Sequence, residues 1–327
     1  MTTAQTPVRP PLASLPAPDR WHRPLMLLAA AMGVLALLAS VLALVDPREI
    51  LGQVAWLKPL KFALSFGLYA LTLAWMIGQL RRWRRIADAA GTVTAIAVVV
   101  EMAIIVGAAT AGTTSHFNVS TPLATALWGA MAVSIVVLWI AALLVGIALA
   151  IARMPDAART RSLRAGVALG LVGMALAFLM TGPTSAQLQD FEGVAGAHAV
   201  GVPDGGAGLP LVGWSTEGGD LRVPHFVGMH ALQLLPLLAL GLELAAHRIR
   251  VLRDPRARLE LVAVATAAFA LLLCLLTVQA LAGQSIVAPA GGILAAGVAL
   301  GVATVTSAAV VLLRGVRRGR AAAAVVA

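Results

Sequence analysis

Two ionisable side chains fall deep inside apolar stretches of the sequence, and they are the first candidates for chemistry. Glu101 and His230 each lie in a run long enough to cross a membrane. Because an ionisable group in hydrocarbon is costly, it marks a functional site by default, and we predict these two as catalytic residues. Glu101 would bind a proton, ligate a metal or neutralise Lys61. The alternative is a neutral carboxyl that is hydrogen-bonded locally, with Thr94 available on the same helix face.

Lysine is rare in this chain: Lys58 and Lys61 are the only lysines among 24 basic residues. Arginine is the ordinary cation here, so these two positions call for the compact ammonium group that a planar guanidinium cannot replace. We predict Lys58 and Lys61, together with Gln233 and Gln279, as ligand-binding residues. The alternative is that the two lysines extend to the membrane interface and bind nothing.

Histidines gather on one side of the chain's expected topology. His116, His198 and His225 lie in or beside connections on that side, and His230 follows just below. Imidazole is the commonest metal ligand and also binds haem iron, so we predict His116, His225 and His230 as ligands of a metal ion or a haem. His225 and His230 are about 140° apart around a helix, however, and do not share a face as an i, i+4 zinc pair does. The alternative role of each is structural, as a helix cap or a partner of a loop carbonyl.

The elements that must position these residues are membrane helices. The chain has 327 residues, of which 60% are hydrophobic and 12% charged, with a mean hydropathy of +0.92. Soluble domains average about 45–50% apolar and about 25% charged residues, so a water-soluble globule is excluded. We predict an all-α, polytopic transmembrane bundle of eight spans. The expected spans are 25–45, 56–80, 89–112, 122–152, 165–182, 224–246, 259–282 and 290–313.

Arginine placement predicts the orientation of these spans. Of 22 arginines, 20 fall in connections on one side, and only Arg48 and Arg222 fall on the other. The positive-inside rule places the arginine-rich side in the cytoplasm, so both termini are expected there. The net charge of +10 belongs to this topology and requires no nucleic acid as partner. The single cysteine, Cys274, lies in an expected span, which excludes an intrachain disulfide and a cysteine metal cage.

Three segments flank or interrupt the membrane domain, which is expected over residues 25–314. Residues 1–24 hold six prolines and are expected to form a disordered cytoplasmic leader. Residues 315–327 are expected to form a cytoplasmic tail. Residues 183–223 are too polar to span and too long for an ordinary turn, so we expect an extracytoplasmic lid folded over the bundle. The alternative is a flexible tether.

Helix geometry gives the predicted site residues similar depths. The expected depths below the outer surface are about 6 Å for Lys61, about 5 Å for Gln279, about 9 Å for His230, about 13 Å for Gln233 and about 16 Å for Glu101. We therefore expect one polar layer in the outer half of the bundle, opening outward above an apolar plug. Gln79 and Glu243 lie near the cytoplasmic helix ends, where we expect them to reach water.

Three runs resemble those of uncharacterised bacterial integral membrane proteins, and the similarity covers residues 50–245. They are residues 56–62 (WLKPLKF), residues 115–118 (SHFN), and residues 218–222 (GGDLR) followed by residues 225–233 (HFVGMHALQ). The group has no established activity, so the resemblance implies only a bacterial origin and a multi-pass location in the cytoplasmic (inner) membrane. It assigns no role to any residue.

Three function classes fit this pattern, and the sequence leaves the oligomeric state open. The first is a membrane protein that binds a metal, a haem or a small ligand in its outer half for redox or hydrolytic chemistry. The second is a proton-coupled transporter of a small, anionic substrate, in which Glu101 carries the proton and Lys58 and Lys61 attract the anion. The third is a sensor or assembly factor that binds a lipid headgroup or a partner at the same lysines.

Overall fold

The computed structural model describes residues 17–152, 154 and 156–326. Most of the expected leader, residues 1–16, lies outside this part of the chain. Pro18–Arg20 form a short 3-10 helix, η2, which precedes the first membrane helix. That helix begins at Arg23 because His22 caps it: the ring Nδ1 accepts a hydrogen bond from the backbone N–H of Leu25 at 3.4 Å.

Eight helices in the described part are long and apolar enough to cross a bilayer, which confirms the all-α polytopic bundle. Six of the eight begin and end within five residues of the expected bounds. The helices are α1 (Arg23–Val45), α2 (Leu57–Gly78), α3 (Arg84–Thr110), α4 (Pro122–Ile151), α5 (Ala157–Ala175), α7 (Arg222–Ala245), α8 (Pro255–Leu281) and α9 (Gly291–Val326).

The other two helices differ from expectation at their polar ends. Helix α5 starts eight residues before the expected position 165 because Asp156 caps it, accepting the Arg159 backbone N–H at 2.8 Å. It continues as the 3-10 helix η3 (Leu176–Met180). Helix α9 runs on through the segment expected as a tail. Arginines near a helix end thus extend a helix beyond its apolar stretch, which hydropathy alone does not detect.

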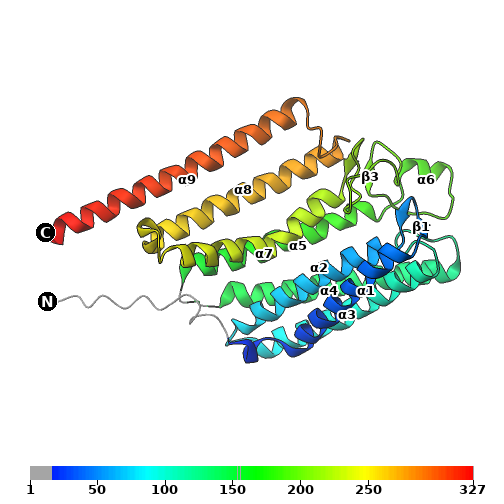
Figure 1. Cartoon of the computed structure of the whole chain (residues 1–327), viewed down its shortest axis with the longest axis horizontal. Coiled ribbons are helices and arrows are strands. Elements are labelled where there is room, and N and C mark those ends of the chain that lie inside the picture. The colour runs from blue at the N-terminus through cyan, green and yellow to red at the C-terminus, as the bar shows by residue number, and fades with distance from the viewer. Residues whose placement is uncertain (1–16, 153, 155, 327) are drawn as a thin grey trace.

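The bundle consists of two helix groups that lie side by side (Figure 1). Helices α1 to α4 pack on one another and form the first group, while α5, α7, α8 and α9 form the second. The groups meet where α4 packs against α5. There the Trp139 indole N–H donates to the Leu171 carbonyl at 3.0 Å, and Val167 fills the space beside Gly146. A common apolar core runs through this seam.

The two ends of the bundle differ in chemistry. We call the end with the short connections α2–α3, α4–α5 and α7–α8 the arginine-rich end. The opposite end is the loop end. It carries an antiparallel hairpin of β1 (Glu49–Ile50) and β2 (Gln53–Val54), and an antiparallel pair of β3 (Ala199–Val200) and β4 (Gly219–Asp220).

Residues 181–221, which we call the cover segment, are folded onto the loop end. They contain the short helix α6 (Ser185–Gln189). Their backbone bonds to the α3–α4 connection: Val119 N–H donates to Gly193 and Ala195 N–H donates to Phe117, each at 2.9 Å. The segment therefore lies against both helix groups at this end.

Helices α5 and α7 are in backbone contact at two glycines. A Cβ added to Gly173 would lie 2.3 Å from the carbonyl carbon of Gly228, and one added to Gly228 would lie 2.5 Å from the Cα of Gly173. Small residues let membrane helices approach this closely, and dispersion contacts then stabilise the pair. No side chain larger than hydrogen fits at either position.

A buried ion pair joins the same two helices at the arginine-rich end. Arg159 and Glu243 are 7% and 8% exposed, and the guanidinium donates to both carboxylate oxygens, from Nε at 3.1 Å. The expectation that Glu243 reaches water is therefore wrong, because its face of α7 turns toward α5. Gln79 is half-buried: its Nε2 is buried and has no hydrogen-bond partner among the described residues, but part of its surface remains accessible.

The Arg159–Glu243 pair should contribute strongly to stability. We expect Glu243→Ala to cost about 3–5 kcal/mol, because it leaves a buried guanidinium without its carboxylate. Asp88→Ala is the matched control: it breaks the more exposed Arg84–Asp88 pair on α3 and should cost less than about 1 kcal/mol. Unfolding free energies of the purified protein in detergent measure both, and equal losses would contradict the prediction.

The glycine contact gives a second prediction. Gly173→Ala should destabilise the protein by about 3 kcal/mol, because the methyl group would overlap the α7 backbone, which cannot move aside as a flexible side chain can. Gly107→Ala on α3 has nothing within 4 Å of the new methyl group and should stabilise by up to about 1 kcal/mol. Thermal melting of both variants is the measurement. A neutral effect of Gly173→Ala would show that the helices do not touch there.

Candidate functional site

Three cations from both helix groups converge at the loop end. Lys58 and Lys61 lie in the first two turns of α2, and Arg222 is the first residue of α7. Each of these three charges interacts electrostatically with the other two. All three side chains are half-buried, and like charges repel one another, so bringing these cations together costs the protein electrostatic energy.

The three cations differ in how they are held. Arg222 donates from Nε and Nη2 to Asp220, which is 2% exposed, and from Nη2 to the Gly213 carbonyl at 2.6 Å. The Lys61 ammonium donates only to the Val212 carbonyl of the cover segment, at 3.2 Å. The Lys58 side chain forms no hydrogen bond or ion pair with any residue that the structure describes. The ammonium group of Lys58 is therefore the one cation of the cluster that is left for a ligand.

Among the described residues, Glu101 is the one carboxylate that interacts electrostatically with Lys58. It lies on α3 and is 1% exposed, and neither carboxylate oxygen accepts a hydrogen bond from a described residue. The hydroxyl of Thr94, which was the expected local partner, is also without a hydrogen bond. Seven residues of helix separate the two by about 10 Å, so sharing a face does not bring them into contact. In the part of the chain that the structure describes, Glu101 therefore has no serine or threonine hydrogen-bonded to it.

His116 stands beside this cluster inside an aromatic enclosure. Its ring centroid lies 5.5 Å from that of Phe62, 5.4 Å from Trp128 and 6.1 Å from Phe117. Burial lowers the pKa of His116 well below its ordinary value, and nearby Lys58 acts in the same direction. The ring is therefore neutral at physiological pH, and its Nδ1 lies 3.0 Å from the Ser115 hydroxyl.

His198 of the cover segment joins this aromatic group. Its ring lies 4.8 Å from Phe117, and its Nδ1 lies 2.8 Å from Asp204 Oδ2. Burial lowers the pKa of His198, and the carboxylate only partly opposes this. Burial would raise the pKa of Asp204, but hydrogen bonds from the His198 ring and from the backbone N–H groups of His198 and Ala199 outweigh it, and the pKa falls to about 2. Asp204 therefore orients the imidazole as a carboxylate orients many functional histidines.

The two α7 histidines use different partners, as their spacing predicts. The Nδ1–H of His225 donates to the Gly173 carbonyl at 2.8 Å, so the glycine contact between α5 and α7 also positions this ring. Nδ1 of His230 lies 3.4 Å from Oε1 of Gln233, which is buried. In the part of the chain that the structure describes, no group of three or more His, Cys, Asp or Glu side chains is placed to hold a metal ion. The metal set His116, His225 and His230 stays a prediction to which the geometry adds no support.

The predicted polar layer is only partly assembled. Electrostatic contacts connect Lys58, Lys61, Glu101 and His116, and they connect His225 with His230 and His198. Gln279 serves another purpose: its Nε2 donates to the Ser285 carbonyl at 2.7 Å and fixes the α8–α9 connection. Its depth fits the layer, but its helix face turns toward this connection.

Sequence reasoning missed Arg222 and the His198–Asp204 pair as parts of the site. Arg222 is one of only two arginines opposite the arginine-rich side, and that exceptional placement is a signal that could have marked it. No comparable signal exists for His198 and Asp204, because their proximity depends on the fold of a long connection.

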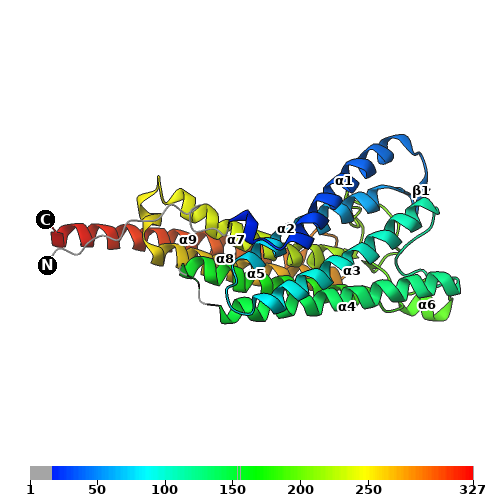
Figure 2. The ribbon, with the colours of Figure 1, turned by 90° about the horizontal axis from the view of Figure 1, so that it is seen from below.

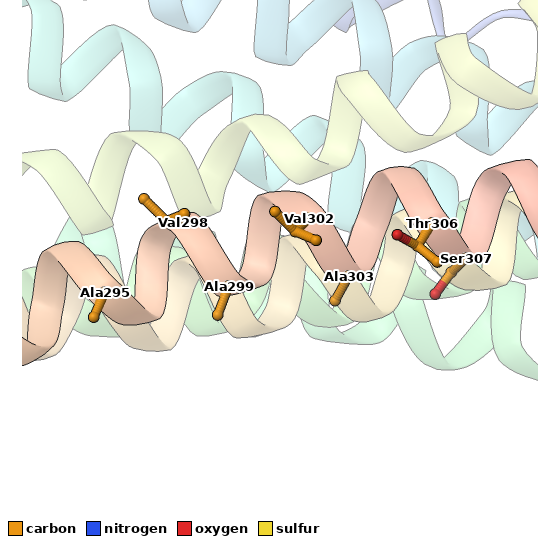
Figure 3. Close-up of a pocket in the computed structure, with 7 residues that line it drawn as sticks. All are labelled: Ala295, Val298, Ala299, Val302, Ala303, Thr306 and Ser307. Atoms are coloured by element: carbon orange, nitrogen blue, oxygen red, sulfur yellow. The ribbon is translucent and has the colours of Figure 1, made fainter.

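An open depression on α9 is a different kind of feature (Figure 3). Small and β-branched side chains of a single helix line it, and its only polar side chains are those of Thr306 and Ser307. It contains no ionisable group. The candidate site for chemistry is therefore the loop end and not this surface.

Comparison with known proteins adds no assignment: no family model, no curated protein and no solved structure matches this chain. What the fold defines is a multi-pass α-helical membrane protein with a cation cluster, a buried carboxylate and an imidazole group at one end.

The histidine environments predict an acid-labile loop end. The folded protein keeps His116 and His198 neutral, whereas the unfolded chain protonates them near pH 6.5, so stability should fall below this pH by up to about 1.4 kcal/mol per unit for each ring. The contribution of Asp204 is present above its ordinary pKa of 3.8 and is lost as the pH falls through about 2. Melting temperatures between pH 8 and pH 5 test the histidine part.

Two variants separate the site from the rest of the protein in this experiment. His116→Gln should make the melting temperature fall less steeply with pH, because glutamine does not titrate and the His198 contribution remains. His247→Gln changes an exposed histidine beyond α7 and should leave the decline as in the unmodified protein. Identical profiles for His116→Gln and the unmodified protein would refute the assignment.

Proposed function

We propose that the protein transports a small anion across the membrane together with a proton. The anion would bind at Lys58 and Lys61, and Glu101 would carry the proton. The observation that carries this proposal is that Lys58, with no hydrogen-bonding partner among the described residues, stands in a three-cation cluster above a carboxylate that accepts no hydrogen bond from them. Asp220 neutralises Arg222, and Glu101 is the only described carboxylate that acts on Lys58, so an anion would balance the positive charge that remains on the two lysines.

Proton coupling follows from the position of Glu101. Lys58 is its electrostatic partner, so an anion bound to Lys58 would compete for that positive charge. Added negative charge near a carboxylate favours its protonated form. Anion binding and proton uptake would therefore occur together, and the carboxyl would cross the hydrocarbon without net charge, which is the inexpensive form there.

The architecture supports movement as well as binding. Lys58, Lys61 and Glu101 belong to the first helix group, whereas Arg222 and His225 belong to the second. A site between two helix groups can open to either side when one group tilts against the other, as in many transporters. Pro236 inside α7 packs beside Gly166 of α5, where its missing backbone N–H gives this helix a point at which it can bend. Access from the loop end would require the cover segment to release Lys61 from the Val212 carbonyl.

The arginine bias supports an orientation for this transport. With the arginine-rich end in the cytoplasm, both termini are cytoplasmic and the loop end faces outward. In a bacterial inner membrane, protons enter from the side of the loop end. The proposed direction is therefore uptake of the anion with a proton.

Reconstituted protein in liposomes tests the proposal, with acetate, succinate and inorganic phosphate as probes and a pH-sensitive dye inside. Lys58→Gln should weaken uptake of the transported anion at least tenfold. Arg48→Gln is the control for general attraction: Arg48 is exposed at the same end and paired with Asp46, and its loss should change uptake less than twofold. Glu101→Gln should retain anion binding but abolish proton movement. Uptake and acidification that survive Glu101→Gln unchanged would refute proton coupling, and the absence of flux for all probes would refute the anion assignment.

A second function, cofactor-based redox or hydrolytic chemistry, has one observation in its favour. His225 donates from Nδ1 to a carbonyl, and Nδ1 of His198 pairs with a carboxylate, which leaves Nε2 of both rings free as ligand atoms. Metal analysis and an absorption spectrum of the purified protein distinguish it. If the purified protein contains no stoichiometric metal and shows no Soret band, only the transport proposal is left.

A further inference from the structure

Helix α9 extends past the rest of the bundle at the arginine-rich end, as both views show (Figures 1 and 2). On its way it crosses the α7–α8 connection, which contains the 3-10 helix η4 (Arg250–Arg253). A Cβ added to Gly315 would lie 2.5 Å from Cγ2 of Val251. This close approach places the arginines near Gly315 and those near Val251 at the same level of the bundle.

The crossing assembles an exposed arginine patch. Its members share three properties: they lie on the α7–α8 connection, at the start of α8 or on the last turns of α9, they are exposed, and they form no ion pair with a described residue. They are Arg248, Arg250, Arg253, Arg256, Arg314, Arg317 and Arg320. The nearby carboxylates are already used, since Asp254 and Glu260 pair with Arg318 and Asp156 pairs with Arg258.

Buried donors beneath the patch also lack acceptors. Nη2 of Arg318 and Nε of Arg258 are buried and have no hydrogen-bond partner among the described residues. One acceptor in the same place, Oε2 of Glu260, is likewise unpartnered. Guanidinium donors that the protein leaves unsatisfied beside an excess of positive charge match an anion that brings several acceptor oxygens.

The depth of the patch identifies the source of that anion. Arg314 lies about 35 Å along α9 from Gly291, which slightly exceeds the hydrocarbon thickness of about 30 Å. The patch therefore lies at the level of the phosphate groups of one leaflet. Guanidinium groups bind phosphate in bidentate fashion, and clusters of basic residues beside membrane helices attract anionic headgroups.

We infer that this patch is a binding site for an anionic phospholipid, whose phosphate lies between the α7–α8 connection and the end of α9. The site is separate from the cation cluster, which is at the other end of the bundle. It would fasten α9, which otherwise packs mainly against α8, to the α7–α8 connection.

The test compares two matched triple variants in nanodiscs of phosphatidylcholine alone or with phosphatidylglycerol or cardiolipin. The patch variant is R250Q/R314Q/R317Q. The control variant, R81Q/R82Q/R85Q, removes three exposed arginines from the α2–α3 region of the same end. The readouts are co-purified phospholipid by native mass spectrometry and the melting temperature. Anionic lipid should stabilise the unmodified and control proteins, and the patch variant should lose at least half of that shift and its retained lipid.

Every other outcome counts against the inference. Equal losses in both variants would show that any arginines of this end suffice, and no loss in either would show that the patch is not used. Equal stabilisation by glycerol 3-phosphate in solution would indicate a free phosphate ester and not a lipid. If the patch variant does not fold, R250K/R314K/R317K is measured in its place. This variant keeps the charge but not the bidentate geometry, so it should retain lipid with weaker binding.

Discussion

A bilayer supplies no water to the charged groups within it, and the loop end is built around that constraint. Lys58 and Glu101 are placed where solvation is poor, and the described residues give them electrostatic contact with each other but no hydrogen bonds. Other charged groups are paired: Arg159 with Glu243 at the arginine-rich end, and Arg222 with Asp220 within the loop end itself. The contrast separates charges that hold the fold together from charges that are kept available.

The stabilising pairs and the site depend on the same helix contact. The crossing at Gly173 and Gly228 brings α5 against α7, which buries the Arg159–Glu243 pair at one end and directs the His225 ring to the Gly173 carbonyl at the other. Arg222 begins the same helix. A contact without any polar side chain thus determines where the polar side chains of α7 are placed.

Hydropathy and arginine placement predicted the eight spans, because insertion of a segment into a bilayer depends directly on its local hydrophobicity and charge. The same reasoning assigns Lys61 and Glu101 to one polar layer, and both side chains interact electrostatically with Lys58. The depth of a residue along its helix does not determine which neighbouring helix that residue faces. Gln279 therefore bonds to the α8–α9 connection, and Glu243 pairs α7 with α5. The His198–Asp204 pair depends on the fold of a 41-residue connection, whose path has no periodic sequence signal.

The backbone contact between α5 and α7 also constrains how this sequence can diverge. Gly173 and Gly228 are far apart in the chain, yet each occupies the space that a side chain at the other would need. A mutation at either one would have to be preceded by a shift of the whole helix pair, which would carry His225 and Arg222 with it. Substitution at either glycine alone is therefore sterically disfavoured, and any change that the fold accepts must alter both helices together.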